Sequence, residues 1–485
     1  MAASQLPLET LSTWAMFNDV DLVDVEAHEI PGCGLGLVSN KDLSREEETF
    51  DIPTLLRIPH ELVLSAEAVE NYAKVDKNFR QLLDVAGHKS TRHDICLFLL
   101  TQKVLSDRPK TSLHGGVSTP WTEYVKYLPP QVPVTTLWTE QEREMLNGTS
   151  LESATAAKIV ALTDEFDELR EMSSSLPFWN ELFWESDKVS LIDWARVDAW
   201  FRSRCLELPK SGEAMVPVLD LANHSSEANA YYEENSKDEV VLLLRPGCRV
   251  SSGEEMTISY GDAKSGAEML FSYGFIDPAS AADRITLPLT PLEDDPLGKA
   301  KLHIFEGPPT VEFVRTDGSI SWESPFAYFM CLNEEDGLSF RVLQDTGGSR
   351  ELKLFWQEYD VTTTTRAFNQ HINGHPLAQI FRLRVVTVLQ DLVAGQLERL
   401  ATGMSLEDLD ESLNEGGLVC GTCINAAATL RERETSLLEA TMKALQDQKT
   451  RLLTDENVVA YLGSMEDTQN DLAEGEASND EEDFS

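Results

Sequence analysis

The sequence predicts an α+β protein, because strand-like segments flank a long helical stretch and further helices follow them. Short apolar runs bounded by Gly and Pro turns occur within residues 23–58 and again within residues 214–260. Between them, apolar residues recur at helical spacing, and after about residue 283 a mixed stretch leads into a helix-dominated end. At 485 residues, the chain has room for about two or three packed units.

Each expected element rests on its local pattern. Alternating or continuous apolar residues next to turn residues define the strands, and the turn Pro31-Gly32-Cys33-Gly34 separates the first two. The expected strands are 23–29, 36–39, 54–58, 214–221, 240–244 and 256–260. Apolar positions three and four residues apart define the helices. The expected helices are 8–18, 93–105, 154–172, 263–272, 378–400, 406–413 and 426–453.

Acidity dominates the composition, with 83 Asp and Glu against 40 Lys and Arg and a net charge of −43. Residues 464–485 contain no Lys or Arg, so we expect a disordered acidic tail. This charge disfavours binding to nucleic acid or to anionic membranes and favours a basic protein partner. Seven scattered cysteines and the lack of a secretory or membrane-spanning run predict reduced thiols and a location in the cytoplasm, the nucleus or both. We also expect a monomer.

The most informative motif is Asn223-His224, which follows an apolar run in VPVLDLANHSS. Further on, an expected strand ends at Tyr260 in the segment GEEMTISYGD, and Tyr273 lies in the segment FSYGF. The glycine-rich turn at residues 32–36 is not a dinucleotide-binding loop, because residues 37–39 continue as a strand instead of opening a helix. Each motif alone is weak, and His224 has no Cys or His at ligand spacing that would make a metal site, so we expect no bound metal.

Taken in this order, the motifs resemble those of the SET-domain protein methyltransferases. The resemblance is strongest to the branch that includes the Rubisco large-subunit, ribosomal-protein and actin-histidine methyltransferases, whose Trp-x-x-Tyr-x-x-x-Leu-Pro signature recurs from Trp121 to Pro129. It implies a SET β-fold interrupted by a helical insertion and followed by an all-α substrate-binding domain. The implied divisions are an N-terminal helix (1–20), two SET parts (21–90 and 196–282), the insertion (91–195), the C-terminal domain (283–463) and the tail (464–485).

The resemblance also implies roles for individual residues, with S-adenosylmethionine as the cofactor. Residues that would contact this cofactor are Cys33, Gly34, Leu35, Arg204, Asp220, Asn223, His224 and Tyr273. Arg204 would hold its carboxylate, for which Arg202 is a competing choice. Tyr260 would direct the substrate amine, and Tyr273 with one of Tyr231 or Tyr232 would wall the lysine channel.

The expected function is transfer of a methyl group to a lysine of a basic protein, by family a ribosomal protein or a translation factor. Two alternatives stay open: methylation of a histidine, and a non-catalytic interaction protein of the same fold. The CxxC motif from Cys420 to Cys423 has no second Cys pair, so two structural cysteines are favoured over zinc or redox chemistry.

Overall fold

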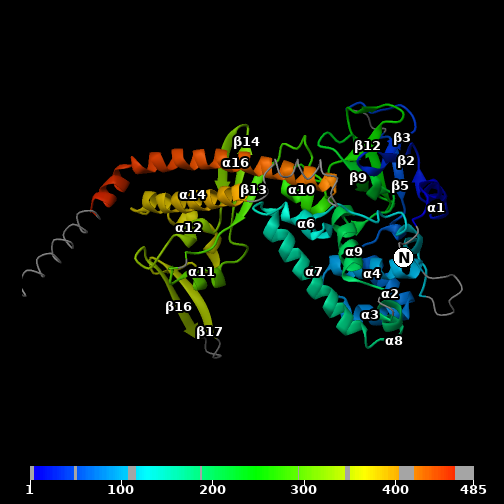
Figure 1. Cartoon of the computed structure of the whole chain (residues 1–485), viewed down its shortest axis with the longest axis horizontal. Helices are drawn as coiled ribbons and strands as arrows, with labels where there is room; N and C mark the ends of the chain where they lie inside the picture. Colours follow the sequence, from blue (N-terminus) through cyan, green and yellow to red (C-terminus); the bar gives the residue numbers. More distant parts are fainter. Residues whose placement is uncertain are drawn as a thin grey trace, which may run out of the picture. The chain divides into compact units, whose positions relative to one another are not determined.

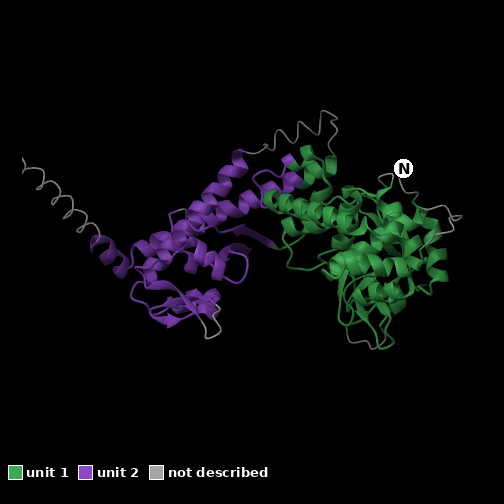
Figure 2. Cartoon of the chain, turned by 90° about the horizontal axis from the view of Figure 1, so that it is seen from below, with its two compact units in different colours: residues 1–143, 151–282, 419–426 green, residues 144–150, 283–418, 427–485 purple. Residues whose placement is uncertain are grey.

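The computed structural model describes residues 5–47, 52–107, 116–185, 188–292, 294–344, 350–402 and 420–464 (Figure 1). The chain forms two compact units (Figure 2). Unit 1 consists of residues 1–143, 151–282 and 419–426, and unit 2 of residues 144–150, 283–418 and 427–485. Each unit has a hydrophobic core of its own. Within the described helices, none combines the length and the apolar character needed to cross a membrane.

Unit 1 contains two four-stranded sheets, with strand orders β1-β5-β10-β9 and β2-β3-β12-β8, and the two-stranded ribbons β4-β11 and β6-β7. Most pairs are antiparallel, but β8 and β12 run parallel, with Asn223 opposite Thr257. The strands are β1 Asp21–Leu22, β2 Val25–Ile30, β3 Gly34–Ser39, β4 Leu43–Ser44, β5 Thr54–Ile58, β6 Cys205–Leu208, β7 Gly212–Met215, β8 Asn223–His224, β9 Ala230–Glu234, β10 Val240–Leu244, β11 Arg249–Val250 and β12 Glu255–Ile258.

Several helices of unit 1 begin at a Ser or Asp whose side chain caps the helix N-terminus. Ser190 caps α9, and its hydroxyl and the Asp193 carboxylate each accept a hydrogen bond from the backbone N–H of the other residue. The helices are α1 Leu11–Phe17, α2 Ala66–Val75, α3 Lys77–Ala86, α4 Thr91–Ser106, α5 Pro120–Tyr124, α6 Glu140–Glu144, α7 Leu151–Ser173, α8 Pro177–Trp179, α9 Leu191–Arg204 and α10 Gly266–Tyr273. Shorter turns are η1 Leu8–Thr10, η2 His60–Leu62, η3 Thr135–Leu137, η4 Asn180–Trp184 and η5 Leu219–Leu221.

Unit 2 combines helices with two three-stranded sheets, so the expectation of an all-α C-terminal domain is wrong. In β14, Val311 and Phe313 are fully buried while Glu312 between them is not, which is the alternation of a half-buried strand. The strands are β13 Asp283–Pro288, β14 Thr310–Thr316, β15 Ser319–Glu323, β16 Leu338–Gln344, β17 Arg350–Trp356 and β18 Tyr359–Asp360. The helical elements are α11 Gly298–Ile304, α12 Ala327–Met330, η6 Thr362–Ala367, α13 Phe368–His371, α14 Ala378–Thr402 and α16 Gly421–Leu453.

Most other expectations about the elements agree with the structure, and the α+β class is confirmed. The expected strand over residues 214–221 is wrong in its second half, because β7 ends at Met215 and η5 follows. Val218 between them adopts a φ of 70°, which a β-branched residue rarely does and which breaks the strand. The expected helix at 406–413 and the acidic tail from 465 onward lie outside the described residues.

Candidate active site

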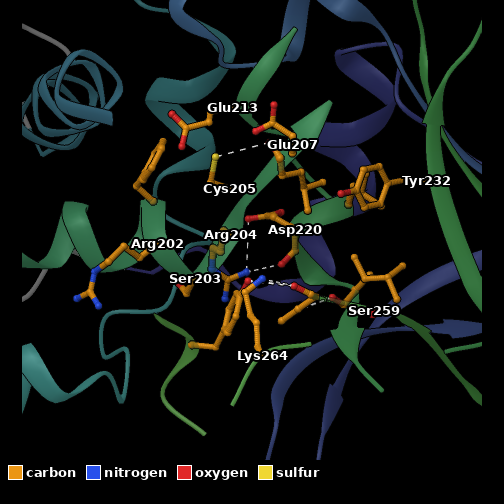
Figure 3. A pocket seen from close by; sticks show the side chains of 17 residues that line it. Arg202, Ser203, Arg204, Cys205, Glu207, Glu213, Asp220, Tyr232, Ser259 and Lys264 are labelled. Atoms are coloured by element: carbon orange, nitrogen blue, oxygen red, sulfur yellow. Dashed lines mark hydrogen bonds and ion pairs between the residues drawn. The ribbon is translucent and has the colours of Figure 1, made fainter. Parts of the chain in front are cut away.

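A cavity of about 300 Å³ opens in unit 1 beside the end of α9 and the β6-β7 ribbon (Figure 3). Six residues singled out from the sequence line it, and they come from five separate stretches of the chain, with Arg202 and Arg204 both in α9. Arg204 ends α9, Asp220 lies in η5, Tyr232 in β9, Tyr260 two residues beyond β12, and Tyr273 at the end of α10. The fold therefore brings together side chains that span about seventy residues of sequence.

Arg204 and Asp220 form a buried pair at this cavity. The Arg204 Nη1 donates to the Asp220 backbone oxygen at 2.6 Å and lies 3.4 Å from its carboxylate. The Tyr124 hydroxyl also donates to that carboxylate, and it accepts a hydrogen bond from the Val218 backbone N–H at 2.7 Å. Burial raises the pKa of Asp220, and the Arg204 charge opposes this effect. These bonds fix the strained turn that precedes Asn223.

Arg202, the competing arginine, is used elsewhere. Its Nε donates to the Asp198 carboxylate at 2.8 Å and its Nη2 to the Thr136 hydroxyl at 2.6 Å. Figure 3 shows its guanidinium pointing away from the pair formed by Arg204 and Asp220. Arg204, by contrast, has a buried Nε–H without a hydrogen-bond partner among the described residues. A buried donor of this kind is available to a ligand.

Asn223 connects the glycine-rich turn to the strand that leads to Tyr260. Its amide nitrogen donates to the Leu35 oxygen at 3.3 Å and to the Glu255 carboxylate at 2.7 Å. Gly36 permits this approach, because a Cβ at that position would lie 2.9 Å from the Asn223 amide nitrogen. Gly34 begins β3 with a φ of 83°, and Leu35 follows it on the same strand. Cys33 lies exposed in the turn before them.

His224 braces the backbone of Tyr260. Its Nδ1 accepts the Tyr260 N–H at 3.0 Å, and its Nε2 lies 3.3 Å from an Asp277 carboxylate oxygen. A neutral ring that accepts at Nδ1 carries its proton on Nε2, so it donates to Asp277. The Tyr260 hydroxyl donates to the Ala222 oxygen at 2.8 Å. Burial raises the pKa of Tyr260, which keeps this hydroxyl protonated.

Three tyrosines wall the cavity, and a fourth lies outside it. The rings of Tyr260 and Tyr273 have centroids 4.7 Å apart, and Tyr232 also lines the cavity. Tyr231 is not among the lining residues, and its hydroxyl accepts a hydrogen bond from Arg45 at 3.3 Å. Successive residues of a strand point to opposite faces, so only one of the two neighbouring tyrosines can face the cavity.

Three further charged residues line the cavity and were not singled out from the sequence. The Lys264 Nζ donates a hydrogen bond to the backbone carbonyl oxygen of Tyr260 and lies 5.5 Å from the centroid of the Tyr273 ring. Glu207 and Glu213 are directly opposed across the β6-β7 ribbon, and both are exposed at the cavity. No sequence motif marks them, because their position depends on the pairing of β6 with β7. Among the described residues, no group of three His, Cys, Asp or Glu side chains could hold a metal ion.

The two sheets are separated in sequence by a helical insertion, and Tyr260 lies at the cavity. Asn223, His224 and residues 33–35 are not among the lining residues, although His224 bonds to the Tyr260 backbone. This arrangement is that of a SET-type fold. No protein-family model matches the chain. SET domain-containing protein 8 of Schizosaccharomyces pombe is 30% identical over 417 residues, which are 84% of this chain and 89% of that protein. The chain therefore belongs to the SET-domain family.

Further relatives and solved structures are consistent with this assignment. The ribulose-1,5-bisphosphate carboxylase/oxygenase large subunit N-methyltransferase of Nicotiana tabacum is 26% identical over 319 residues, 62% of this chain and 57% of that protein. The actin-histidine N-methyltransferase of Drosophila melanogaster is 23% identical over 301 residues, 58% and 51% of the two chains. A crystal structure of the SET domain of LSMT bound to lysine and AdoHcy matches with a TM-score of 0.67 at 22% identity, covering 95% and 98% of the two chains.

Proposed function

We propose that this protein is an S-adenosylmethionine-dependent protein-lysine N-methyltransferase that acts on a basic protein. The observation that carries the proposal is the hydroxyl of the half-buried Tyr260, which is held at the Ala222 carbonyl in a cavity walled by Tyr232 and Tyr273. Solved relatives of the same fold were crystallised with AdoMet and with lysine and AdoHcy. The residues of this chain fit such a cofactor, because the unpartnered Arg204 Nε–H offers a donor to an anionic group.

Bound S-adenosylmethionine would supply a methyl group on a positively charged sulfur. The substrate lysine must lose its proton before it can attack, and its ordinary pKa is about 10.4. Enclosure between the rings of Tyr232 and Tyr273 removes water from the ammonium and so favours the neutral amine. The Tyr260 hydroxyl is itself protonated, so the proton leaves through water at the mouth of the cavity.

Alignment is then the main task of the protein, because methyl transfer is an in-line displacement. The Tyr260 hydroxyl oxygen keeps lone pairs free while its proton is held by the Ala222 carbonyl. These two oxygens can accept weak C–H···O contacts from the transferring methyl group. His224 holds the backbone of Tyr260 in place through its N–H. Tyr260 is thus the proposed catalytic residue, and His224 is a positioning residue.

Glu207 and Glu213 support a basic substrate. Two like charges directly opposed across an antiparallel ribbon destabilise it, so a cationic side chain between them is favoured. Both carboxylates are exposed at the cavity. A lysine with a basic neighbour fits this arrangement, and a ribosomal protein or a translation factor has the required charge.

The Tyr260→Phe substitution tests the proposal. Purified protein is incubated with labelled S-adenosylmethionine and a cell lysate, and cofactor binding is measured separately by calorimetry. We expect transfer to fall by about a hundredfold or more while cofactor binding is retained. Tyr231→Phe is the matched control, because Tyr231 lies outside the cavity, and it should retain full transfer. Undiminished transfer by Tyr260→Phe would contradict the proposed role.

Histidine methylation is the second candidate, because the actin-histidine enzyme of Drosophila melanogaster is among the relatives. Peptide mass spectrometry of the labelled band separates the two candidates by the residue that carries the methyl group. A methylhistidine product that depends on Tyr260 would replace the lysine proposal and leave the methyltransferase proposal intact. Absence of any labelled band, together with absence of cofactor binding, would refute both.

A further inference from the structure

Cys420 and Cys423 lie one helical turn apart at the start of α16. The Cys420 carbonyl accepts hydrogen bonds from the N–H groups of Cys423 at 3.0 Å and Ile424 at 3.1 Å. Cys420 is therefore the N-cap residue, and Cys423 is the third residue of the helix. Side chains at this spacing are neighbours on the helix surface, and a disulfide can join residues whose Cα atoms are about 4.4–6.8 Å apart.

The two thiols differ in exposure and in acidity. Cys420 is exposed, whereas Cys423 is only 6% exposed. The Thr422 hydroxyl lies 2.9 Å from the Cys420 sulfur, and hydrogen bonds from this hydroxyl and from the first amides of the helix lower the pKa of Cys420. Burial, followed by the nearby Glu142 charge, raises the pKa of Cys423. One thiol is therefore accessible and readily ionised, and the other is enclosed and protonated.

A buried carboxylate contacts both cysteines. Glu142, in α6, is 6% exposed and accepts the Cys420 N–H at 2.9 Å. It also forms a side-chain hydrogen bond with the Cys423 thiol. Although burial alone would raise it, hydrogen bonds from Cys420 and Thr139 lower the pKa of Glu142, so it is ionised and can accept a proton. These residues lie 278 positions apart in the sequence, and all belong to unit 1.

We propose that Cys420, Cys423 and Glu142 form a thiol–disulfide exchange site. None of them lines the cavity of the candidate active site, so the inference does not depend on the proposed methyl transfer. The arrangement also replaces the expectation of two structural cysteines, because an exposed N-cap thiol makes no contribution to the core. A second thiol and a carboxylate beside it supply the two further groups that exchange requires.

The exchange partner is a small or protein disulfide, such as oxidised glutathione. The Cys420 thiolate attacks one sulfur, forming a mixed disulfide and releasing one glutathione thiolate. Cys423 then gives its proton to Glu142, its sulfur attacks the Cys420 sulfur, and the second glutathione thiolate leaves. Two thiols of the protein are oxidised to one disulfide while one glutathione disulfide is reduced to two thiols, and the released protons pass to water and to the thiolates.

The test equilibrates the full-length chain in buffers of reduced and oxidised glutathione and quenches exchange with acid. Free thiols are then alkylated with iodoacetamide after the protein is redissolved in denaturant at about pH 8, where thiolates form, and peptides are mapped by mass spectrometry. We expect a disulfide between Cys420 and Cys423, while the other cysteines stay reduced and are recovered as alkylated peptides. Cys423→Ser should stop at a mixed disulfide on Cys420, and Cys420→Ser should form neither product. Glu142→Gln should slow closure of the ring at least about tenfold without changing the first attack on Cys420.

Cys33 provides the matched control within the same sample. It is also exposed, but burial and the Glu255 charge raise the pKa of Cys33. At pH 7 in the unmodified protein, iodoacetamide should react with Cys420 at least about tenfold faster than with Cys33. Equal or slower reaction of Cys420 would overturn the proposal without requiring any variant. A pair that stays reduced under excess oxidised glutathione, or a disulfide from Cys420 to a different cysteine, would overturn it as well.

Discussion

Glu434 is a buried acid whose replacement by Gln should stabilise unit 2 above neutral pH. It lies in α16, is 5% exposed, and accepts a hydrogen bond from the Ser150 N–H at 2.9 Å. Arg431, one helical turn earlier, donates to the backbone oxygens of Asn147 and Leu400, each at 2.6 Å. Burial raises the pKa of Glu434 to about 7, against an ordinary value of 4.5. Gln keeps the shape and the hydrogen bonds of the protonated acid without its charge.

The magnitude follows from these two pKa values. When the pKa of an acid is higher in the folded state, its contribution to stability is complete at pH values below the unfolded-state pKa. This contribution is lost as the pH rises through the folded-state pKa. One pKa unit is worth about 1.4 kcal/mol, so nearly all of a difference of about 3 kcal/mol is lost by pH 8. Part of the loss has already occurred at pH 5. Between pH 5 and pH 8, the Glu434→Gln variant should therefore gain about 2 kcal/mol relative to the unmodified protein.

Hydrogen exchange measured by mass spectrometry on peptides of α16 reports this difference locally. A gain of about 2 kcal/mol means that the ratio of exchange rates, unmodified protein over variant, should rise roughly thirtyfold from pH 5 to pH 8, after correction for the intrinsic pH dependence. Glu439→Gln is the matched control, because Glu439 is exposed on the same helix and its replacement should change nothing. Faster exchange of Glu434→Gln at pH 8, or an equal gain at both pH values, would refute the reasoning.

Two further predictions concern the candidate active site. Tyr124→Phe removes one hydrogen bond from the buried Asp220 carboxylate, which keeps Arg204 as a partner, and one from the Val218 backbone N–H. We therefore expect about 1–3 kcal/mol of lost stability in thermal unfolding and weaker cofactor binding in calorimetry, and unchanged values of both would contradict this. The double substitution Glu207→Gln and Glu213→Gln should raise the KM for a basic substrate about three- to tenfold and reduce its salt dependence, with kcat retained. An unchanged KM would show that these carboxylates do not contribute to substrate recognition. Glu233→Gln is the control, because Glu233 is exposed and lies outside the cavity.

Local patterns predicted the elements that carry the candidate site. The turn before Gly34, the strand that ends close to Tyr260 and the helix that ends at Tyr273 all have short-range signals in apolar spacing and turn residues. The alternation of buried and exposed residues in β14 is equally local, although it lies in a domain that the resemblance implies to be all-α. Whether the individual residues bind cofactor or substrate as the resemblance implies stays a prediction.

By itself, the sequence determined the α+β class, the order of the motifs and the residue types at the candidate site, because these depend on neighbours along the chain. Only the tertiary structure decided that Arg204 pairs with Asp220 while Arg202, at the same cavity, is bonded to Asp198. It likewise decided that Tyr232 lines the cavity while Tyr231 does not. The same holds for Glu142, which meets Cys420 across 278 residues of sequence. Each of these choices depends on strand register, on the angle at which a helix ends, or on packing between distant segments, and no local pattern encodes such long-range contacts.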